Sequence, residues 1–339
     1  MKYNIIFLYA ELTEYLLWCI EEFLKRNKDF NFIVIQLDNK KTSKYNPKSN
    51  YFEIINKSAF KNYFDFKKFI VNKNPSALFV SGRMSLHYLF VSLYFKNKIP
   101  VTTCQDSLIE NNFKFKFKVL LRNIIYHKFF DNFWGTGEDH AQYARLMGFK
   151  EKNIFKGFYV GNRNVFKKKK FKKNAIPKLI FIGRDHSNKN LDFLIKILQK
   201  INNASVKITL TVIGINKTTE SKYIEYLGFK NSFQINEISS KHDYFILPSK
   251  YEPWGVVTHE QLMIGNPVII SDICGSSSLI KNEKNGYIFK NNDSNEFEKI
   301  LNSLIKQYPL GYKQLSQNAY NSSKEINFEE WEKTILKLL

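Results

Sequence analysis

One stretch of the sequence, residues 244–270, constrains the fold more than any other. An apolar run that ends at Leu247 is followed by Pro248 and a polar loop. Helix-like spacing then begins near Gly255 and ends at Gly265, where a second apolar run starts. The pattern predicts a strand, a loop, a helix and another strand, and parallel strands require such a crossover. We therefore expect a doubly wound α/β sheet, in which ligands bind beyond the carboxyl ends of the strands.

Two glutamates stand in this stretch, Glu252 in the loop and Glu260 about two turns into the predicted helix. The free backbone N–H groups at the helix start, around Val256 and Val257, would form an anion site between the two carboxylates. A sugar nucleotide has the matching layout, with hydroxyls at both ends of a diphosphate. The alternative is that Glu252 is a solvated loop charge and Glu260 an exposed helix position, which is the usual state of surface carboxylates.

The residues around the glutamates resemble the E-x7-E signature of retaining nucleotide-sugar glycosyltransferases, glycosyltransferase family 4 in particular. Pro248-Ser249 precedes the pair, and Gly265-x-Pro267-Val268 follows it. In that family the first glutamate contacts the donor sugar and the second contacts the ribose. The resemblance implies these roles for Glu252 and Glu260, and the helix start at Gly255, Val256 and Val257 is the expected site of the donor diphosphate.

A pair of cations, Arg184 and Lys189, follows the apolar run 178–182 and Gly183. Such a pair at the mouth of a sheet can hold a diphosphate, arginine through its planar fork and lysine as a point charge. Two solvated loop cations are the alternative. The order Gly-Arg, four residues, Lys also resembles the same family. The resemblance implies that Arg184 and Lys189 bind the diphosphate and act in catalysis together with Glu252.

Apolar runs and helical periods alternate along the whole chain, which is typical of Rossmann-like domains. The resemblance implies the GT-B type of α/β fold, with two such domains facing a central cleft. We expect an acceptor-binding domain at 1–165, a donor-binding domain at 174–325, and a helix at 326–339 that crosses back to the first domain. Strands are predicted at 3–9, 32–37, 51–55, 77–80, 100–103, 132–134, 178–182, 208–213, 232–235 and 244–247, and helices at 12–26, 60–71, from 84, and at 138–147.

The first half matches the family loosely. The Gly-Gly turn that usually follows the first strand is replaced by Tyr9-Ala10-Glu11, and the usual His-Asp is replaced by Gln105-Asp106. Asp106 is a candidate for orienting or deprotonating the acceptor hydroxyl. Capping of the following helix is an equal alternative for this aspartate.

The net charge of +21 implies attraction to anions, which include nucleic acid, anionic membranes and phosphorylated substrates. Residues 113–130 combine five basic residues with aromatic and aliphatic ones and contain no acid. As a helix they would lie in an anionic membrane interface, or else pack as an ordinary helix with a solvated basic face. Residues 166–173 hold six lysines, and we expect them to form an extended, solvated linker between the domains rather than a nucleic-acid site.

Cys19, Cys104 and Cys274 form no Cys-x-x-Cys pattern, so a metal cluster or a disulfide scaffold is not expected. No run of 18 uncharged apolar residues and no signal-peptide pattern occurs, which predicts a cytoplasmic protein, peripheral on the inner face of the membrane. The sequence also contains no Asp-x-Asp, the motif with which many glycosyltransferases hold a divalent metal. We therefore expect no metal and no cofactor.

The resemblance implies a hexosyltransferase that retains the anomeric configuration, and the lack of an Asp-x-Asp predicts that it needs no metal. It would move a sugar from a nucleotide-sugar donor to a lipid-linked or surface-polysaccharide acceptor, such as lipopolysaccharide, O-antigen or capsule. Two alternatives stay open. One is a sugar-nucleotide epimerase or glycan phosphorylase of the same architecture, and the other is a polyanion-binding module without chemistry, which would bind nucleic acid in a salt-sensitive way.

Overall fold

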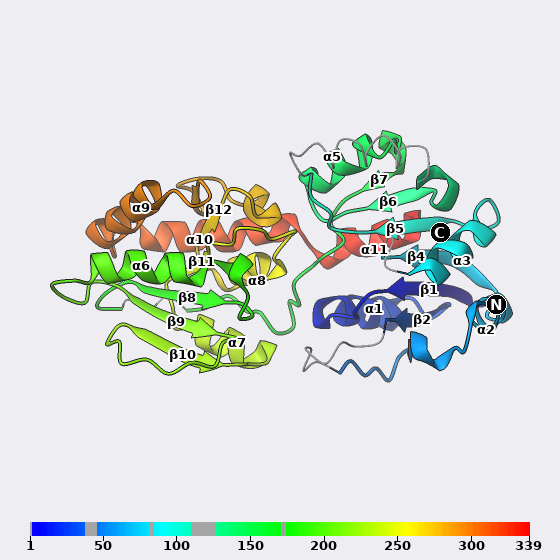
Figure 1. Ribbon diagram of the computed structural model, residues 1–339, viewed down its shortest axis with the longest axis horizontal. Coiled ribbons are helices and arrows are strands. Elements are labelled where there is room, and N and C mark those ends of the chain that lie inside the picture. Colours follow the sequence, from blue (N-terminus) through cyan, green and yellow to red (C-terminus); the bar gives the residue numbers. More distant parts are fainter. Residues whose placement is uncertain (1, 38–45, 82–84, 110–125, 171, 173) are drawn as a thin grey trace. The chain divides into compact units, whose positions relative to one another are not determined.

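The chain folds into two compact units, each described here by itself (Figure 1). The computed structural model describes residues 2–37, 46–81, 85–109, 126–170, 172 and 174–339. The first unit consists of two segments, the chain up to Val160 and Phe328–Leu339. The second unit is Gly161–Asn327. Each unit is a parallel sheet with helices, so the prediction of two Rossmann-like domains is confirmed. No helix in the described part of the chain is long and apolar enough to cross a bilayer.

The first unit has a parallel sheet in the order β3-β2-β1-β4-β5-β6-β7. Its strands are β1 (Tyr3–Tyr9), β2 (Phe30–Gln36), β3 (Glu53–Asn56), β4 (Pro75–Val80), β5 (Val101–Cys104), β6 (Asn132–Trp134) and β7 (Ile154–Phe155). Its helices include α1 (Glu14–Arg26), α2 (Tyr63–Asn72), α3 (Leu86–Phe95), α5 (Glu138–Leu146) and α11 (Phe328–Lys337). The central strands are mainly apolar because most of their residues are buried on both faces of the sheet.

The last helix, α11, belongs to the first unit because its apolar stripe packs there. Trp331, Ile335 and Leu338 are buried. The indole N–H of Trp331 donates to the carbonyl of Phe158 at 3.1 Å. The ring of Phe328 lies edge-on to that of Trp18 on α1, with centroids 5.6 Å apart.

The second unit has a parallel sheet in the order β10-β9-β8-β11-β12-β13. Its strands are β8 (Lys178–Ile182), β9 (Thr209–Ile213), β10 (Ile224–Gly228), β11 (Tyr244–Leu247), β12 (Val268–Ser271) and β13 (Gly286–Phe289). Its helices include α6 (Leu191–Ile201), α7 (Ser232–Ser239), α8 (Val256–Ile264), α9 (Ser294–Gln307) and α10 (Tyr312–Ser322). The strand order reverses between β8 and β11, and such a switch point is where doubly wound sheets bind ligands.

The predicted strand at 232–235 is wrong, because these residues begin helix α7. The apolar Phe233 of this stretch does not enter a sheet core and is 68% exposed. A capping box starts the helix instead. The side chain of Asn231 accepts from the Gln234 amide at 2.9 Å, and the Gln234 side chain accepts from the Asn231 amide. The strand of this region is β10, which the sequence analysis missed.

The predicted solvated linker at 166–173 is wrong for Phe166 and Lys169, which pack on the second unit, whereas its other described lysines, Lys167, Lys168, Lys170 and Lys172, are exposed as expected. Phe166 is buried. The ammonium of Lys169 donates to the carbonyl of His242, to the side-chain oxygen of Asn266 and to the Tyr312 hydroxyl, the last at 2.7 Å. Burial lowers the pKa of Lys169 to about 8. The division between the units lies before this segment, at Val160 and Gly161.

Candidate functional site

The loops after β8 and β11 leave the sheet at the same edge, because the two strands are parallel neighbours. The first loop contains Arg184 and Lys189, and the second contains Glu252. The backbone joins them directly, since the Lys250 amide donates to the carbonyl of Asn188 at 2.7 Å. The switch point of the second sheet is therefore lined by both loops, and each supplies charged side chains.

Lys189 and Glu252 form an ion pair across these loops, with the ammonium hydrogen-bonded to a carboxylate oxygen. Their side chains are 21% and 14% exposed, so the pair is largely withdrawn from water. A withdrawn pair is sensitive to the loss of one partner, because the remaining charge is left uncompensated. The structure thus brings together one predicted cation and one predicted carboxylate at the strand ends.

The backbone around Glu252 is held by the segment that follows β12. The carbonyl of Glu252 accepts from the Gly275 amide at 3.0 Å, and that of Trp254 accepts from the Ser276 amide at 3.1 Å. The buried thiol of Cys274 lies 3.9 Å from the carbonyl oxygens of Leu247 and Ser249. Burial raises the pKa of this thiol, so Cys274 is a neutral packing residue. These contacts fix the height of the Glu252 loop above the sheet.

Helix α8 begins directly after the loop, with Gly255 as its N-cap residue at a φ of +84°. This left-handed conformation favours glycine, and an added Cβ would lie 3.1 Å from Cγ of Glu252. Gly255 has no side chain to cap the helix, so the amides of Val256 and Val257 stand at an uncapped N-terminus. The helix dipole favours an anion at this end, next to the Glu252 side chain.

Glu260 is the fifth residue of α8, a little over one turn from its start rather than the expected two. It is partly buried beside Gly161, where an added Cβ would lie 3.2 Å from Cγ of Glu260. The adjacent His259 is buried, accepts from the Gly161 amide at 3.0 Å and donates to the carbonyl of Ser323 at 2.9 Å. Burial lowers the pKa of His259 to about 4, so it is neutral and structural.

Arg184 lies on the same loop as Lys189, but its side chain is exposed. Within the described residues it has no hydrogen-bond or ion-pair partner. The loop start is fixed by two close glycines, because an added Cβ at Gly214, whose φ is +98°, would lie 2.3 Å from the carbonyl oxygen of Gly183. Arg184 therefore follows a closely packed backbone turn, and its guanidinium has no partner among the described residues.

Sequence analysis did not assign a role to Ser249, which follows Pro248 in the Glu252 loop. Its hydroxyl is fully buried and has no hydrogen-bond partner among the described residues. Buried polar groups are normally paired, so an unpaired one near a candidate site is a further polar atom for a ligand. The Pro-Ser pair in the sequence was the signal, although it was used only to recognise the motif.

In the first unit, Asp106 follows β5 and is partly buried. It lies close enough to Tyr9 and Tyr159 to add to the rise in pKa that burial causes for both phenols, whose oxygens are 3.0 Å apart. The neighbouring Gln105 is buried and donates to the Thr103 hydroxyl at 3.1 Å. The helix that Asp106 was expected to cap, and most of the basic segment 113–130, fall on residues 110–125, outside the described part of the chain.

No group of three or more His, Cys, Asp or Glu residues that could hold a metal ion occurs among the residues that the structure describes. The groups available at the switch point are two cations, the Glu252 carboxylate, a helix N-terminus and a buried hydroxyl, while Glu260 lies further along α8 beside Gly161. Such a set can bind a ligand that combines phosphates with hydroxyls.

The same part of the chain matches a known family. Residues 162–322 match the family model described as Glycosyl transferases group 1. They carry the pattern of a group 1 glycosyltransferase domain. The match includes every candidate residue of the second unit, from Arg184 to Glu260.

Curated relatives share parts of this chain at moderate identity. An uncharacterised glycosyltransferase of Methanocaldococcus jannaschii is 31% identical over 34% of this chain and 33% of its own length. An uncharacterised 41.2 kDa protein in the cps region of Klebsiella pneumoniae is 24% identical over 42% of each chain. An Escherichia coli UDP-Gal:alpha-D-GlcNAc-diphosphoundecaprenol alpha-1,3-galactosyltransferase is 34% identical over 25% of this chain and 21% of its own. The chain thus spans well under half the length of these relatives.

Solved structures resemble the whole chain in fold. Sucrose-phosphate synthase from Thermosynechococcus elongatus superposes with a TM-score of 0.76, covering 99% of this chain and 98% of its own at 13% identity. Anabaena HepE in complex with UDP and glucose superposes with a TM-score of 0.73 over the same shares at 14% identity. At such low identity the likeness concerns the fold, two Rossmann-like domains.

Proposed function

We propose that this protein is a glycosyltransferase that uses a nucleotide-sugar donor. The observation that supports the proposal most is the Lys189–Glu252 ion pair, which stands at the switch point of the sheet and inside the segment that matches the group 1 model. A basic and an acidic side chain meet there beside an open helix N-terminus. The diphosphate of a donor can bind the basic side chain and the helix N-terminus, and its sugar hydroxyls can bind the carboxylate.

In this proposal the donor diphosphate lies between Lys189, Arg184 and the amides of Val256 and Val257. When the bond to the sugar breaks, negative charge accumulates on the leaving nucleoside diphosphate, and cations fixed near it lower the barrier. Glu252 accepts hydrogen bonds from the sugar, and Glu260 accepts them from the ribose. Because Lys189 is paired with Glu252 in the free protein, donor binding must redirect both side chains, one to phosphate and one to sugar.

We further propose transfer with retention of the anomeric configuration and without a divalent metal. The supports are the resemblance of the glutamate motif to retaining enzymes and the lack of an Asp-x-Asp in the sequence. Front-face attack, in which a donor phosphate oxygen takes the acceptor proton, requires cations that hold that phosphate in place. Arg184, whose exposed guanidinium has no partner in the described part of the chain, is suited to adjust to the phosphate as it moves.

The acceptor that we propose is a lipid-linked or surface-polysaccharide glycan, met on the cytoplasmic face of an anionic membrane. Support comes from the names of two relatives, one in a cps region and one that acts on a diphosphoundecaprenol-linked sugar. In the first unit Asp106 is the candidate to orient the acceptor hydroxyl, since it lies at the carboxyl end of β5 near two phenols. The charge of +21 favours the anionic surface.

The test is donor turnover by the purified chain. A panel of nucleotide sugars is incubated with it, with and without EDTA, and the released sugar is followed by proton NMR at early times. We expect hydrolysis of one donor, with the anomeric configuration retained, unchanged EDTA rates, and loss in Glu252→Gln. The matched control is Glu298→Gln, which breaks the exposed Lys200–Glu298 pair of the same unit. Conversion to an epimer, or release that depends on inorganic phosphate, would instead indicate the epimerase or phosphorylase alternative.

A further inference from the structure

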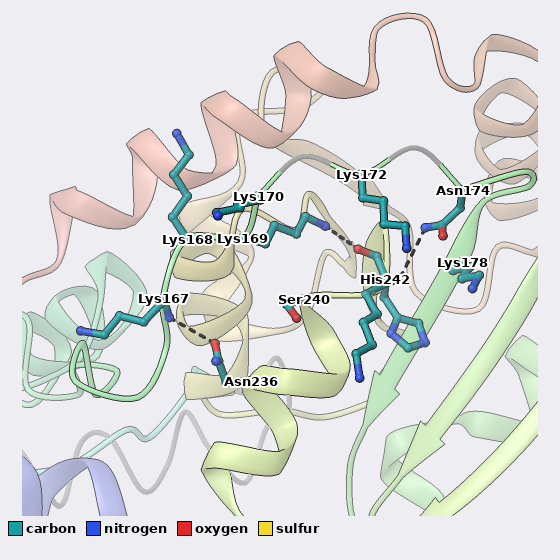
Figure 2. A pocket seen from close by; sticks show the side chains of 11 residues that line it. Lys167, Lys168, Lys169, Lys170, Lys172, Asn174, Lys178, Asn236, Ser240 and His242 are labelled. Carbon is teal, nitrogen blue, oxygen red and sulfur yellow. Dashed lines mark hydrogen bonds between the residues drawn. The ribbon is translucent and has the colours of Figure 1, made fainter.

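A second charged region of the same unit lies around the segment that was expected to be a linker. It is a cavity of about 680 Å³. Of its eleven described lining residues, seven are lysines, and none is acidic. Five lysines come from the run 167–172, and the others are Lys178 and Lys241 (Figure 2). This lysine cavity has the volume of an ordinary small-ligand site.

The lysines divide into anchored and unpaired ones. In Figure 2 the Lys169 side chain extends to the His242 carbonyl, where it is fixed, and the Lys172 side chain points to the same region. The ammonium of Lys241 pairs with exposed Glu237 at 2.8 Å. In the described part of the chain, the ammonium groups of Lys170, Lys172 and Lys178 have no hydrogen-bond or ion-pair partner. The cavity therefore presents several cations that no protein anion neutralises.

The buried acid Asp243 lies close enough to Lys169 to favour its ammonium form, so it offsets part of the charge of that anchored lysine but not that of the unpaired ones. Its carboxylate accepts from the Asn174 side chain at 3.0 Å, from the Lys178 backbone amide at 2.9 Å and from the Tyr308 hydroxyl at 3.2 Å. His242, which lines the cavity, adds no charge of its own, because burial lowers its pKa to about 4. The excess positive charge of the cavity is thus a property of its lysines.

The lysine cavity is separate from the candidate donor site. Lys178 is the first residue of β8, and His242 stands two residues before the start of β11. Arg184, Lys189 and Glu252 follow the other ends of these strands. A strand of this length spans roughly 15 Å, so the two regions lie at opposite edges of one sheet.

The lysines are most concentrated in this cavity. A neighbouring cavity of about 400 Å³ shares Lys178, Lys241 and His242 with it, but adds only Lys222, which is offset by Glu225, and otherwise has uncharged lining residues. An extended polyanion such as nucleic acid needs a basic track that continues beyond one cavity. A compact anion does not need such a track.

We propose that the lysine cavity binds a compact ligand with two or more adjacent phosphates, either a soluble polyphosphate or the phosphorylated headgroup of a membrane lipid. Each phosphate offers several oxygens to different ammonium groups, and such charge-assisted hydrogen bonds are strong. Binding also relieves the mutual repulsion of lysines that are held together by the anchored Lys169. The site is distinct from the donor site, and it stands whether or not the chain transfers a sugar.

The test uses the full chain with Arg184→Ala and Lys189→Ala, so that the donor site does not bind the probe. Tripolyphosphate is titrated calorimetrically at an ionic strength of about 0.15 M, where exposed charges are screened beyond about 8 Å, and sedimentation is measured with phosphatidylcholine vesicles that contain diacylglycerol pyrophosphate. The cavity variant is Lys170→Ser/Lys172→Ser/Lys241→Ser, which leaves the anchoring Lys169 in place. The matched control, Lys217→Ser/Lys299→Ser/Lys306→Ser, removes the same charge from exposed positions of the same unit.

We expect the cavity variant to bind at least about tenfold more weakly, and the control to change less than about threefold, because attraction to distant surface charges is screened. Binding of tripolyphosphate identifies a soluble ligand, and binding of vesicles alone identifies a headgroup. The proposal is overturned if neither probe binds, or if both triple variants lose equal affinity, since net charge would then explain the attraction. Circular dichroism of each variant verifies that it is folded.

Discussion

Lys189 and Glu252 are ion-paired across two loops that follow neighbouring parallel strands. In this pair each side chain binds the other instead of a donor, which would need Lys189 for its diphosphate and Glu252 for its sugar. A nucleoside diphosphate must take Lys189 away from Glu252, whereas a complete sugar nucleotide can satisfy both. This relationship separates binding of the diphosphate from turnover of the sugar.

We therefore predict opposite effects of Glu252→Gln on binding and on turnover. The neutral amide releases Lys189, so the bare nucleoside diphosphate binds about threefold to tenfold more tightly, as expected for removal of a partly exposed ion pair. Sugar transfer falls about a hundredfold, because a fixed group at the reacting sugar is lost. Calorimetry and donor hydrolysis measure the two. Weaker binding of the bare diphosphate by Glu252→Gln would contradict the assignment, and Glu298→Gln should change neither.

Arg184 and Lys189 are predicted to differ in their effects on stability. Arg184 is exposed and has no partner among the described residues, so Arg184→Ala should change the free energy of unfolding by less than about 0.5 kcal/mol. Lys189→Ala leaves the Glu252 carboxylate, 14% exposed, without its cation and should destabilise by about 1 kcal/mol. Both should reduce donor turnover about a hundredfold. Urea unfolding and hydrolysis rates test this, and equal stabilities would show that the ion pair is absent in solution.

Gly255 is predicted to be intolerant of a side chain for two separable reasons. Its φ of +84° costs any other residue about 1 kcal/mol, and the added Cβ would press on Glu252. Gly157→Ala is a matched control for the first reason alone, since φ there is +83° and no atom lies within 4 Å. Gly311→Ala has neither problem. We expect Gly255→Ala to lose both stability and donor binding, Gly157→Ala only stability, and Gly311→Ala neither. Donor binding that survives Gly255→Ala unchanged would exclude this helix start from the site.

The second unit is predicted to lose stability as the pH falls from about 6.5 to about 4. Burial lowers the pKa values of His242 and His259 to about 4, so below 6.5 the unfolded state binds protons that the folded state does not. The loss should approach about 3 kcal/mol per histidine. His259→Gln keeps one acceptor and one donor for Gly161 and Ser323, and it should flatten the pH dependence. A slope that persists after both histidines are replaced by glutamine would assign it to other groups.

Lys169 is predicted to be the one lysine of its run that the fold needs. Lys169→Met leaves the oxygens of His242, Asn266 and Tyr312 without their donor, and should destabilise by about 1 to 3 kcal/mol. The control, Lys168→Met, removes an exposed ammonium that donates to Gln317 at 2.6 Å, and should cost less than about 0.5 kcal/mol. Chemical denaturation measures both. A similar loss of unfolding free energy in the two variants would show that Lys169 is as solvated as its neighbours.

The sequence predicted the sheet strands best where they are buried on both faces, as β8 and β11 are, because a continuous apolar run leaves few other structures. It missed β10, an edge strand in which an exposed Glu225 interrupts the apolar pattern. It mistook the start of α7 for a strand because the Asn231–Gln234 capping box, a signal of a helix start, was not considered.

The candidate site was predicted from spacing, and the structure adds what spacing does not contain. Motifs placed Lys189 and Glu252 in two loops, but only the strand order shows that these loops are neighbours. The buried Ser249 hydroxyl and the contact of Gly275 with the Glu252 carbonyl depend on tertiary packing. The burial of Lys169 could not be predicted from a run of lysines, because such a composition favours a solvated segment. Lys169 is buried because oxygens of residues distant in the sequence accept its hydrogen bonds.

His259 connects helix α8 to two chain segments that do not take part in the candidate donor site. One ring nitrogen holds the amide of Gly161, the residue at which the second unit begins, and the other holds the carbonyl of Ser323, four residues before that unit ends. Through this one side chain, helix α8 is tied to both chain segments, at Gly161 and at Ser323, that lie close to the ends of the second unit.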